Sequence, residues 1–217
     1  RPCTSFNMKL IVITSSKSIP DETQTIAKMF EAGLPCLHLR KPRLSTPEMK
    51  AFIEAIPAEF HNRIMLHTHH ELALKYPLRG IHLSRVHLSK KFRYWWVRMR
   101  LKLHFGHVSK SRSYSRLQQV YQTEERAYDY FFLRTIFDTM TGKLYGGYFE
   151  AGLMAANQTA QKVLIARGGT RLSSIETSQR LGFKGIAFGS FIWKAENPVE
   201  QFIRVLKTFQ EQGIAIE

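Results

Sequence analysis

The sequence predicts a single α/β domain with the fold of a (β/α)8 TIM barrel, and three observations lead to that fold class. Short apolar segments rich in β-branched residues recur along the chain, and there are eight of them. The stretches between them have room for helices. Segments that are apolar on both faces suit parallel strands joined by right-handed helical crossovers. Eight such units in 217 residues match a barrel without large insertions.

The expected strands follow one another at intervals of roughly 15 to 30 residues. They cover residues 9–14, 36–40, 63–68, 80–84, 103–109, 130–135, 162–167 and 185–189. Helices are expected over 21–33, from Thr46-Pro47-Glu48 onward, over 173–182 and over 198–212. An open doubly wound sheet is the alternative, but a helix after the eighth strand favours closure.

Domain organisation and location follow from what the chain lacks. Residues 1–7 are interpreted as an N-terminal extension and residues 8–217 as the barrel, because no linker or low-complexity tract interrupts them. The first residues have no apolar segment typical of a secretory signal, and no stretch approaches the ~18 apolar residues of a membrane span. We expect a cytoplasmic protein in which Cys36 is a small core residue.

The charge balance is strongly basic. Lysine and arginine exceed aspartate and glutamate by 32 to 17, which gives a formal net charge of +15. Such a chain favours anionic partners, among them phosphorylated small molecules, nucleic acids and acidic lipids.

In a barrel the reactive groups come from the carboxyl ends of the strands and the loops that follow them. The residues expected at this rim are His38, Arg40, Lys41, Arg43, Thr68, His69, His70, Ser84, Arg85, His87, Ser109, Lys110, Ser113, Thr135, Asp138, Thr139, Thr141, Lys143, Arg167, Gly168, Gly169, Gly189 and Ser190. Cations, hydroxyl groups and glycines dominate this set, and Asp138 is its one obvious carboxylate. The rim therefore suits an anion better than a bare divalent metal ion.

Two glycine-containing loops give the sharpest signal. Gly168 and Gly169 follow the seventh strand, and Gly189 and Ser190 follow the eighth. Glycines let backbone N–H groups approach an oxyanion, and barrels commonly bind phosphate between these two loops. The alternative is that the glycines only make tight turns. Because both loops carry them, we expect a phosphate-binding site.

The histidines raise the question of a metal site. His67, His69 and His70 lie within four residues, and His82 and His87 follow. Neighbouring residues of a strand point to opposite faces, so the first three cannot all converge. His69 and His87 are placed to chelate a transition metal, but no zinc-type spacing supports this, and we expect no metal site.

A basic, aromatic segment covers residues 90–102. It has six cations and includes Trp95 and Trp96. Interleaved cations and rings suit single-stranded nucleic acid, whereas helical spacing gives an ordinary barrel helix with a basic outer face or a contact in a homodimer. We favour the helix and a small phosphorylated ligand over a nucleic-acid partner.

Six motifs, collinear along the chain, resemble those of the thiamine phosphate synthase/thiazole tautomerase family. Leu37-His38-Leu39-Arg40-Lys41 resembles "QLREK", and Gly80-Ile81-His82-Leu83 resembles "GVHL". The others are 113–119 ("SVHSLEE"), 129–139 ("DYVFLSPIFDS"), 165–169 ("IALGG") and 185–189 ("GVAVLG"). The resemblance implies a TIM barrel of thiamine biosynthesis that binds thiazole phosphate or thiamine phosphate. For the synthase, the resemblance also implies that the protein binds an aminopyrimidine diphosphate and Mg²⁺.

The resemblance also implies roles for individual residues. Arg40 and Lys41 are candidates to handle a diphosphate, and His38, His69 and His87 are candidate proton-transfer bases. The candidate phosphate and substrate contacts are Thr139, Thr141, Lys143, Gly168, Gly169, Gly189 and Ser190. The family's Asn-Asp after the third strand aligns with Thr68-His69, and its Asp after the fourth aligns with His87, so both Mg²⁺-binding carboxylates are replaced. No cofactor is expected beyond Mg²⁺, and Mg²⁺ only if the synthase reaction is retained.

Three functions stay open from the sequence. The first is a transferase that forms a C–N bond as thiamine phosphate synthase does. The second is a metal-independent tautomerase-like enzyme. The third is a non-catalytic protein that binds a phosphorylated ligand.

Overall fold

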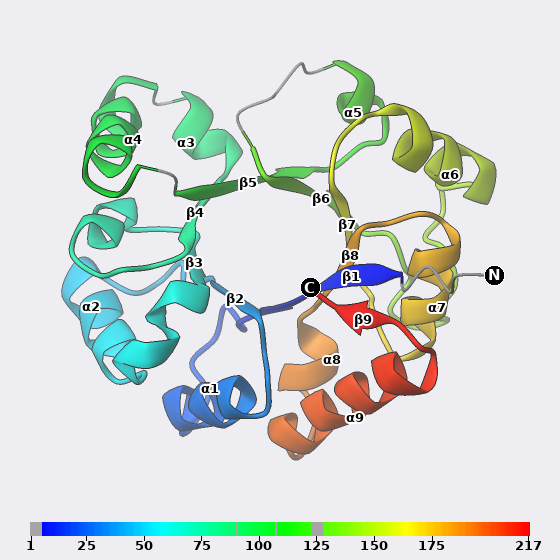
Figure 1. Cartoon of the computed structure of the whole chain (residues 1–217), viewed down its shortest axis with the longest axis horizontal. Coiled ribbons are helices and arrows are strands. Elements are labelled where there is room, and N and C mark those ends of the chain that lie inside the picture. The colour runs from blue at the N-terminus through cyan, green and yellow to red at the C-terminus, as the bar shows by residue number, and fades with distance from the viewer. Residues whose placement is uncertain (1–5, 90, 107, 123–127) are drawn as a thin grey trace.

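Eight parallel strands form a closed ring at the centre of the computed structural model, which describes residues 6–89, 91–106, 108–122 and 128–217 (Figure 1). The strands are β1 (Asn7–Ile13), β2 (Cys36–Leu39), β3 (Ile64–Leu66), β4 (Gly80–Leu83), β5 (Ser109–Tyr114), β6 (Tyr130–Arg134), β7 (Leu164–Arg167) and β8 (Gly185–Phe188). They pair in chain order, and β1 pairs with both β8 and β2, which closes the barrel. The predicted (β/α)8 fold is confirmed.

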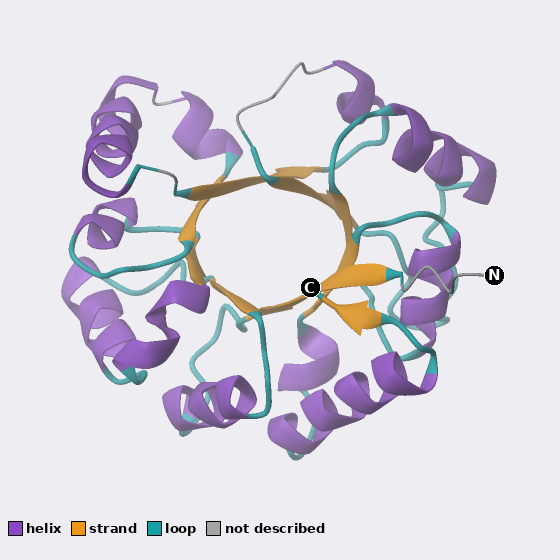
Figure 2. Ribbon diagram, viewed as in Figure 1, coloured by secondary structure: helices purple, strands orange, loops and turns teal. Residues whose placement is uncertain are grey.

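Helices surround the ring on its outer side (Figure 2). They are α1 (Glu22–Glu31), α2 (Thr46–Glu54), α3 (Arg85–Ser89), α4 (Lys91–Phe105), α5 (Gln118–Gln122), α6 (Glu150–Thr159), α7 (Ser173–Arg180), α8 (Ser190–Trp193) and α9 (Pro198–Glu211), with two short 3-10 helices, η1 (Ala58–Arg63) and η2 (His70–Leu74). No helix of the described residues is long and apolar enough to cross a membrane.

Local sequence explains where the best-defined helices begin. Ser45 and Glu48 form a reciprocal capping box at the start of α2, with a proline in its first turn. Asn197 caps α9 by accepting a hydrogen bond from the Glu200 backbone N–H at 3.2 Å. The apolar face of α9 packs Phe202, Val205 and Phe209 into the core between helices and strands.

Both ends of the chain differ from the sequence expectation. β1 begins at Asn7, inside the segment interpreted as an extension, because a ninth strand pairs beside it. This strand, β9 (Ala215–Ile216), follows α9 and lies parallel to the start of β1. The backbone pairing of Asn7 with Ala215 therefore makes the start of the barrel one residue longer than predicted.

The fifth strand was predicted in the wrong place. Residues 103–105 continue α4, and β5 occupies Ser109–Tyr114 instead of residues 103–109. The inward serines of β5, Ser111 and Ser113, contact the ring of His82 on the neighbouring strand β4. β5 therefore lacks the apolar alternation that marks a strand. Ser109 and Lys110 consequently lie at the amino end of β5, away from the rim where the sequence placed them.

Candidate functional site

A cationic cavity of about 680 Å³ opens at the carboxyl ends of β1, β7 and β8. Four residues expected to bind phosphate, Gly168, Gly169, Gly189 and Ser190, line it together, as the sequence analysis anticipated. Cations also line it: Lys17, Arg40, Arg167 and Lys194. None of the described lining residues is an aspartate or glutamate, so the electrostatic environment favours an anion.

Backbone packing holds the first glycine loop in place. Gly168 and Gly169 have φ values of +97° and +66°, a region that glycine adopts readily. A Cβ atom at Gly169 would lie 2.1 Å from the Phe137 carbonyl oxygen, and the Phe137 N–H donates to the Gly168 carbonyl at 3.0 Å. The loop after β6 thus lies directly on this segment, with room only for glycine.

The second glycine loop is tied to the strands below it. Gly189 precedes α8, and a Cβ atom there would meet nothing nearer than the Ile13 carbonyl oxygen at 3.9 Å, so open space adjoins the residue. The indole N–H of Trp193 donates to that same Ile13 carbonyl at 2.7 Å. The Thr170 hydroxyl donates to the Ala187 carbonyl, also at 2.7 Å. These bonds connect both loops to β1 and β8.

Arg167, the last residue of β7, was expected at the rim but not among the phosphate contacts, and it lines the cavity. Burial, together with the nearby cations Arg134 and Arg40, lowers the pKa of Arg167 to about 10. The guanidinium group lies over the Phe132 ring, 5.3 Å from its centroid, and is not within 4.0 Å of any carboxylate of the described residues. Its place directly before Gly168 was the signal available in the sequence.

Arg40 lies in the cavity and is anchored by its backbone. Its N–H donates to the Thr14 hydroxyl at 2.8 Å, which fixes the end of β2 against β1. Lys41 points elsewhere: it is 2% exposed, donates to the Lys17 carbonyl at 2.7 Å and lies 2.5 Å from a Glu22 carboxylate oxygen. The diphosphate role predicted for Lys41 does not fit this geometry, because its charge is neutralised beside α1.

The loop between β6 and α6 holds the three remaining predicted contacts. Thr139, Thr141 and Lys143 are exposed and do not line the cavity. Asp138 accepts hydrogen bonds from the Met140 and Thr141 backbone N–H groups, both at 2.8 Å, which shapes the turn. These hydrogen bonds lower the pKa of Asp138.

The six histidines in and near the rim divide into three environments. His38, His67 and His82 lie inside the barrel, and His38 is fully buried rather than exposed to a substrate. His70 packs against His87 with ring centroids 4.3 Å apart, and burial lowers the pKa of His70 to about 3. His69 and His87 line a second cavity of about 380 Å³, together with Thr68 and Tyr94.

Hydrogen bonds orient the two imidazoles of the second cavity. His69 Nε2 lies 2.7 Å from the Leu44 carbonyl oxygen, so this nitrogen carries the proton, and Nδ1 lies 2.9 Å from the Thr46 hydroxyl. His87 Nδ1 accepts from the Ser84 N–H at 3.1 Å. Burial lowers the pKa of His87 and keeps it neutral near pH 7.

Magnesium does not fit the residues present. Mg²⁺ needs an octahedral shell of oxygen ligands, usually from one or two carboxylates. Among the described residues, the one cluster of three candidate metal ligands consists of histidines. Asp138 is engaged by backbone N–H groups, and Glu22 is paired with Lys41. No step of a reaction is therefore assigned to Mg²⁺.

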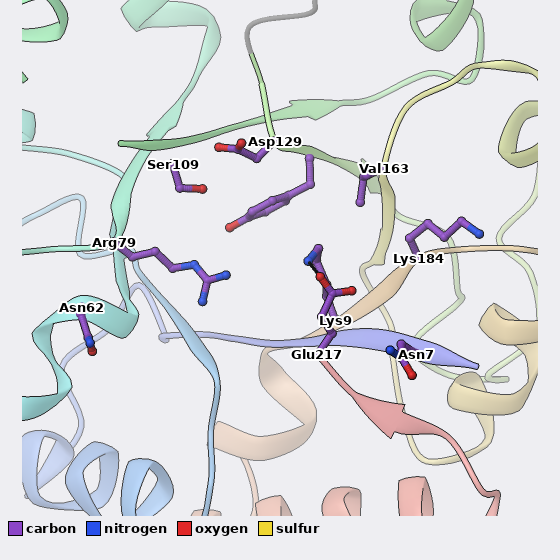
Figure 3. Close-up of a pocket in the computed structure, with 10 residues that line it drawn as sticks. Asn7, Lys9, Asn62, Arg79, Ser109, Asp129, Val163, Lys184 and Glu217 are labelled. Atoms are coloured by element: carbon purple, nitrogen blue, oxygen red, sulfur yellow. Dashed lines mark hydrogen bonds and ion pairs between the residues drawn. The ribbon is translucent and has the colours of Figure 1, made fainter. Parts of the chain in front are cut away.

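Another cavity lies at the opposite end of the barrel (Figure 3). Its volume is about 710 Å³, and its lining comes from the amino ends of strands, including Lys9, Arg79, Ser109 and Lys184. Lys9 forms an ion pair of 2.5 Å with Glu217 there. Barrel enzymes carry their chemistry at the carboxyl ends, so this cavity is not the candidate site.

The basic, aromatic segment forms α4, as favoured from the sequence, although Lys90 lies outside the described residues. Trp95 and Trp96 are 45% and 50% exposed, while Leu101 on the same helix is buried. The indoles thus contribute to the outer surface and the barrel core contacts other positions of α4.

Fold and site define the chain as a closed (β/α)8 barrel with an anion-favouring cavity formed by the loops after β7 and β8. The sequence matches the thiamine monophosphate synthase family over residues 10–192, and the chain belongs to that family. No match is found among curated proteins.

Solved structures of similar proteins agree with this assignment. A thiamine phosphate pyrophosphorylase from Bacteroides thetaiotaomicron has 26% identity and a TM-score of 0.73, covering 94% of this chain and 98% of its own. One from Pyrococcus furiosus has 19% identity and a TM-score of 0.72, covering 94% and 96%. KGPDC from Streptococcus mutans, at 10% identity and a TM-score of 0.69 over 93% and 97%, shares the fold alone.

Proposed function

We propose that this chain is a thiamine phosphate synthase-like protein of thiamine biosynthesis that holds the phosphate of thiazole phosphate or thiamine phosphate in the rim cavity. One observation carries the proposal: Arg167 lines the cavity, is half-buried, and has no carboxylate within 4.0 Å among the described residues. A buried cation is costly unless an opposite charge accompanies it. A phosphate group supplies that charge and accepts hydrogen bonds from the guanidinium.

The proposed recognition combines side chains and backbone. Arg167 and Arg40 neutralise the phosphate charge, while the N–H groups around Gly169 and Ser190 are offered as donors to its oxygens. Gly168 and Gly169 let the backbone approach because no side chain intervenes. The C–N bond-forming reaction of a synthase is a separate proposition, since His69 and His87 stand where the family resemblance places the carboxylates that bind Mg²⁺.

Replacing Arg167 by leucine separates binding from folding. We expect Arg167→Leu to weaken binding of thiamine phosphate by about 10- to 100-fold, which corresponds to the ~1.5–3 kcal/mol typical of a hydrogen bond to a charged group. The same change removes an unpaired half-buried cation, so we expect the free energy of unfolding at pH 7 to rise. Calorimetric titration and urea denaturation measure the two effects.

Arg204→Leu is the matched control, because Arg204 is exposed on α9 and does not line the cavity. It should leave the affinity unchanged. Unphosphorylated thiamine should bind the wild-type chain much more weakly than thiamine phosphate. Equal affinity for thiamine and thiamine phosphate, or equal affinity of both variants, would reject the phosphate site. Product formation from thiazole phosphate and aminopyrimidine diphosphate, with and without Mg²⁺, tests the synthase reaction separately.

A metal-independent proton-transfer activity is the second candidate, and the orientation of His69 favours it. The Leu44 carbonyl holds the proton on Nε2 and leaves Nδ1 as the acceptor nitrogen beside the second cavity. We expect His69→Gln to abolish tautomerisation of a thiazole phosphate, followed by NMR, while EDTA leaves the wild-type rate unchanged. Activity that survives in the variant, or activity that EDTA removes, contradicts this candidate.

A further inference from the structure

The interior of the barrel is unusually polar on one side. Barrel interiors are normally filled by layers of branched apolar side chains. Here β1, β7 and β8 contribute apolar residues such as Ile11, Ile165 and Ala187. The facing part carries imidazoles and hydroxyl groups, which occupy the place of a packed apolar layer. These residues are His38, His67, His82, Ser111, Ser113 and Tyr130.

Three of these side chains converge in space although they come from three different strand segments. His38 is on β2, His67 directly follows β3, and His82 is on β4. One ring nitrogen from each lies within 4.8 Å of the others. His38 Nδ1 and His67 Nε2 are 2.8 Å apart. His38 is fully buried and the other two are at most 7% exposed, so water is largely excluded.

The second nitrogen of two rings has a fixed hydrogen-bond partner. His38 Nε2 lies 2.5 Å from the Tyr130 hydroxyl, and His82 Nδ1 lies 2.8 Å from the Ser111 hydroxyl. Histidines that bind metals almost always use their other nitrogen in this way, because the bond fixes the tautomer and the ring orientation. Two of the three rings therefore have the outer hydrogen bond of a metal-binding histidine. The remaining nitrogen of His82, Nε2, lies 3.1 Å from the Ser113 hydroxyl, so an ion must displace that hydrogen bond.

We infer that His38, His67 and His82 bind one divalent transition-metal ion of the Zn²⁺ type inside the barrel, below the rim cavity. Imidazole nitrogen is a preferred ligand of Zn²⁺, Cu²⁺, Ni²⁺ and Co²⁺, and three histidines leave a fourth position for water or an anion. Mg²⁺ and Ca²⁺, which require oxygen ligands, do not suit this set. This site is distinct from the phosphate cavity and does not depend on the proposed function.

The protonation state of the cluster suits a metal. Burial lowers the pKa of His38, His67 and His82 well below the usual value, with smaller contributions from neighbouring positive charges. The rings are neutral at pH 7, and a neutral imidazole has a lone pair available for coordination. No proton has to leave before the ion binds.

Two features oppose the ion. The Arg167 guanidinium is among the charges that act on all three rings, and it repels a cation. An anionic fourth ligand, such as hydroxide, offsets that repulsion. The His67 ring also stacks on His82 with centroids 4.1 Å apart, so coordination requires it to turn and give up its hydrogen bond to His38. The alternative is a metal-free hydrogen-bond network that only satisfies buried polar groups.

Metal titration of the full chain decides between these interpretations. The protein is stripped with a chelator and titrated with Co²⁺, then with Zn²⁺ in competition. We expect one ion per chain and visible Co²⁺ absorption typical of four-coordinate geometry. X-ray absorption of the Zn²⁺-loaded wild-type chain should show three imidazole ligands. Absence of stoichiometric binding, or fewer than three imidazoles, overturns the inference without relying on any variant.

Variants then locate the ion. Tyr130→Phe removes an outer hydrogen-bond partner and should weaken metal binding by ~10–100-fold. His67→Asn removes a proposed ligand, the one nearest the rim, and should weaken metal binding by more than that range. His69→Asn is the matched control, since it removes a histidine of the second cavity and should leave the affinity unchanged. Loss of binding in the control with retention in His67→Asn overturns the assignment. Circular dichroism verifies that each variant is folded.

Discussion

Acidification from pH 7 to pH 5 is expected to lower the free energy of unfolding of the metal-free chain, by roughly 2 kcal/mol through His70 alone. Four buried imidazoles produce this effect. Burial lowers the pKa of His70 to about 3, and the pKa values of His38, His67 and His82 also lie well below 6.5. The folded chain therefore keeps these rings neutral at a pH where the unfolded chain protonates them.

The direction follows from proton linkage. A group whose pKa is lower in the folded state stabilises the fold fully above its unfolded pKa, near 6.5, and loses that contribution as the pH falls toward its folded pKa. At pH 5 His70 has lost about 1.5 pH units of protection, or roughly 2 kcal/mol. The three other rings lower the stability further in the same direction. The His70 contribution alone is an appreciable part of the ~5–15 kcal/mol stability of typical domains.

Urea denaturation between pH 7.5 and pH 5, with a chelator present, measures this dependence. The slope reports the number of protons taken up on unfolding, which should reach at least about one near pH 5 because His70 stays neutral in the folded chain. His70→Phe should reduce that number by one, and it also removes a buried Nε2 that has no hydrogen-bond partner. His104→Phe, at an exposed position, should leave it unchanged. An unfolding free energy that varies by less than ~1 kcal/mol between pH 7 and pH 5 would contradict the buried neutral state.

The fold could be predicted because most strands carry their own signal. Seven strands are mostly buried and largely built from apolar residues, as helices outside and a filled interior require, and their positions were found to within a few residues. β5 is the exception, and its serines explain why. Ser111 and Ser113 face the imidazole of His82 and not an apolar layer, so the usual hydrophobic alternation is missing.

The candidate site was only partly predictable for a related reason. Glycines at the ends of β7 and β8 identify their loops directly, because position in the chain determines position on the rim. The direction of a side chain is harder to derive from sequence. Lys41 was expected to contact the ligand, but its side chain points away from the cavity and pairs with the buried Glu22. The convergence of His38, His67 and His82 depends on the register of three strands and on strand ends, which spacing along the chain does not encode.

Replacement of Gly169 by alanine is expected to destabilise the fold by roughly 3–5 kcal/mol, because two costs add. The residue has a φ of +66°, which an L-residue with a side chain adopts at a cost. A Cβ atom would also lie 2.1 Å from the Phe137 carbonyl oxygen, a backbone atom that cannot rotate away. The β6 loop would have to move, and the wall of the phosphate cavity would move with it.

Two other glycines separate these costs in urea denaturation. Gly147 has a φ of +100° with open space around it, so Gly147→Ala should show the conformational cost alone, about 1–2 kcal/mol. Gly146 has open space and no positive φ, and its replacement should change the stability by less than ~0.5 kcal/mol. If Gly169→Ala is no more destabilising than Gly147→Ala, the backbone at Phe137 can move away from the added Cβ atom at little cost. The glycine would then be required for its backbone conformation and not for the close approach of the two loops.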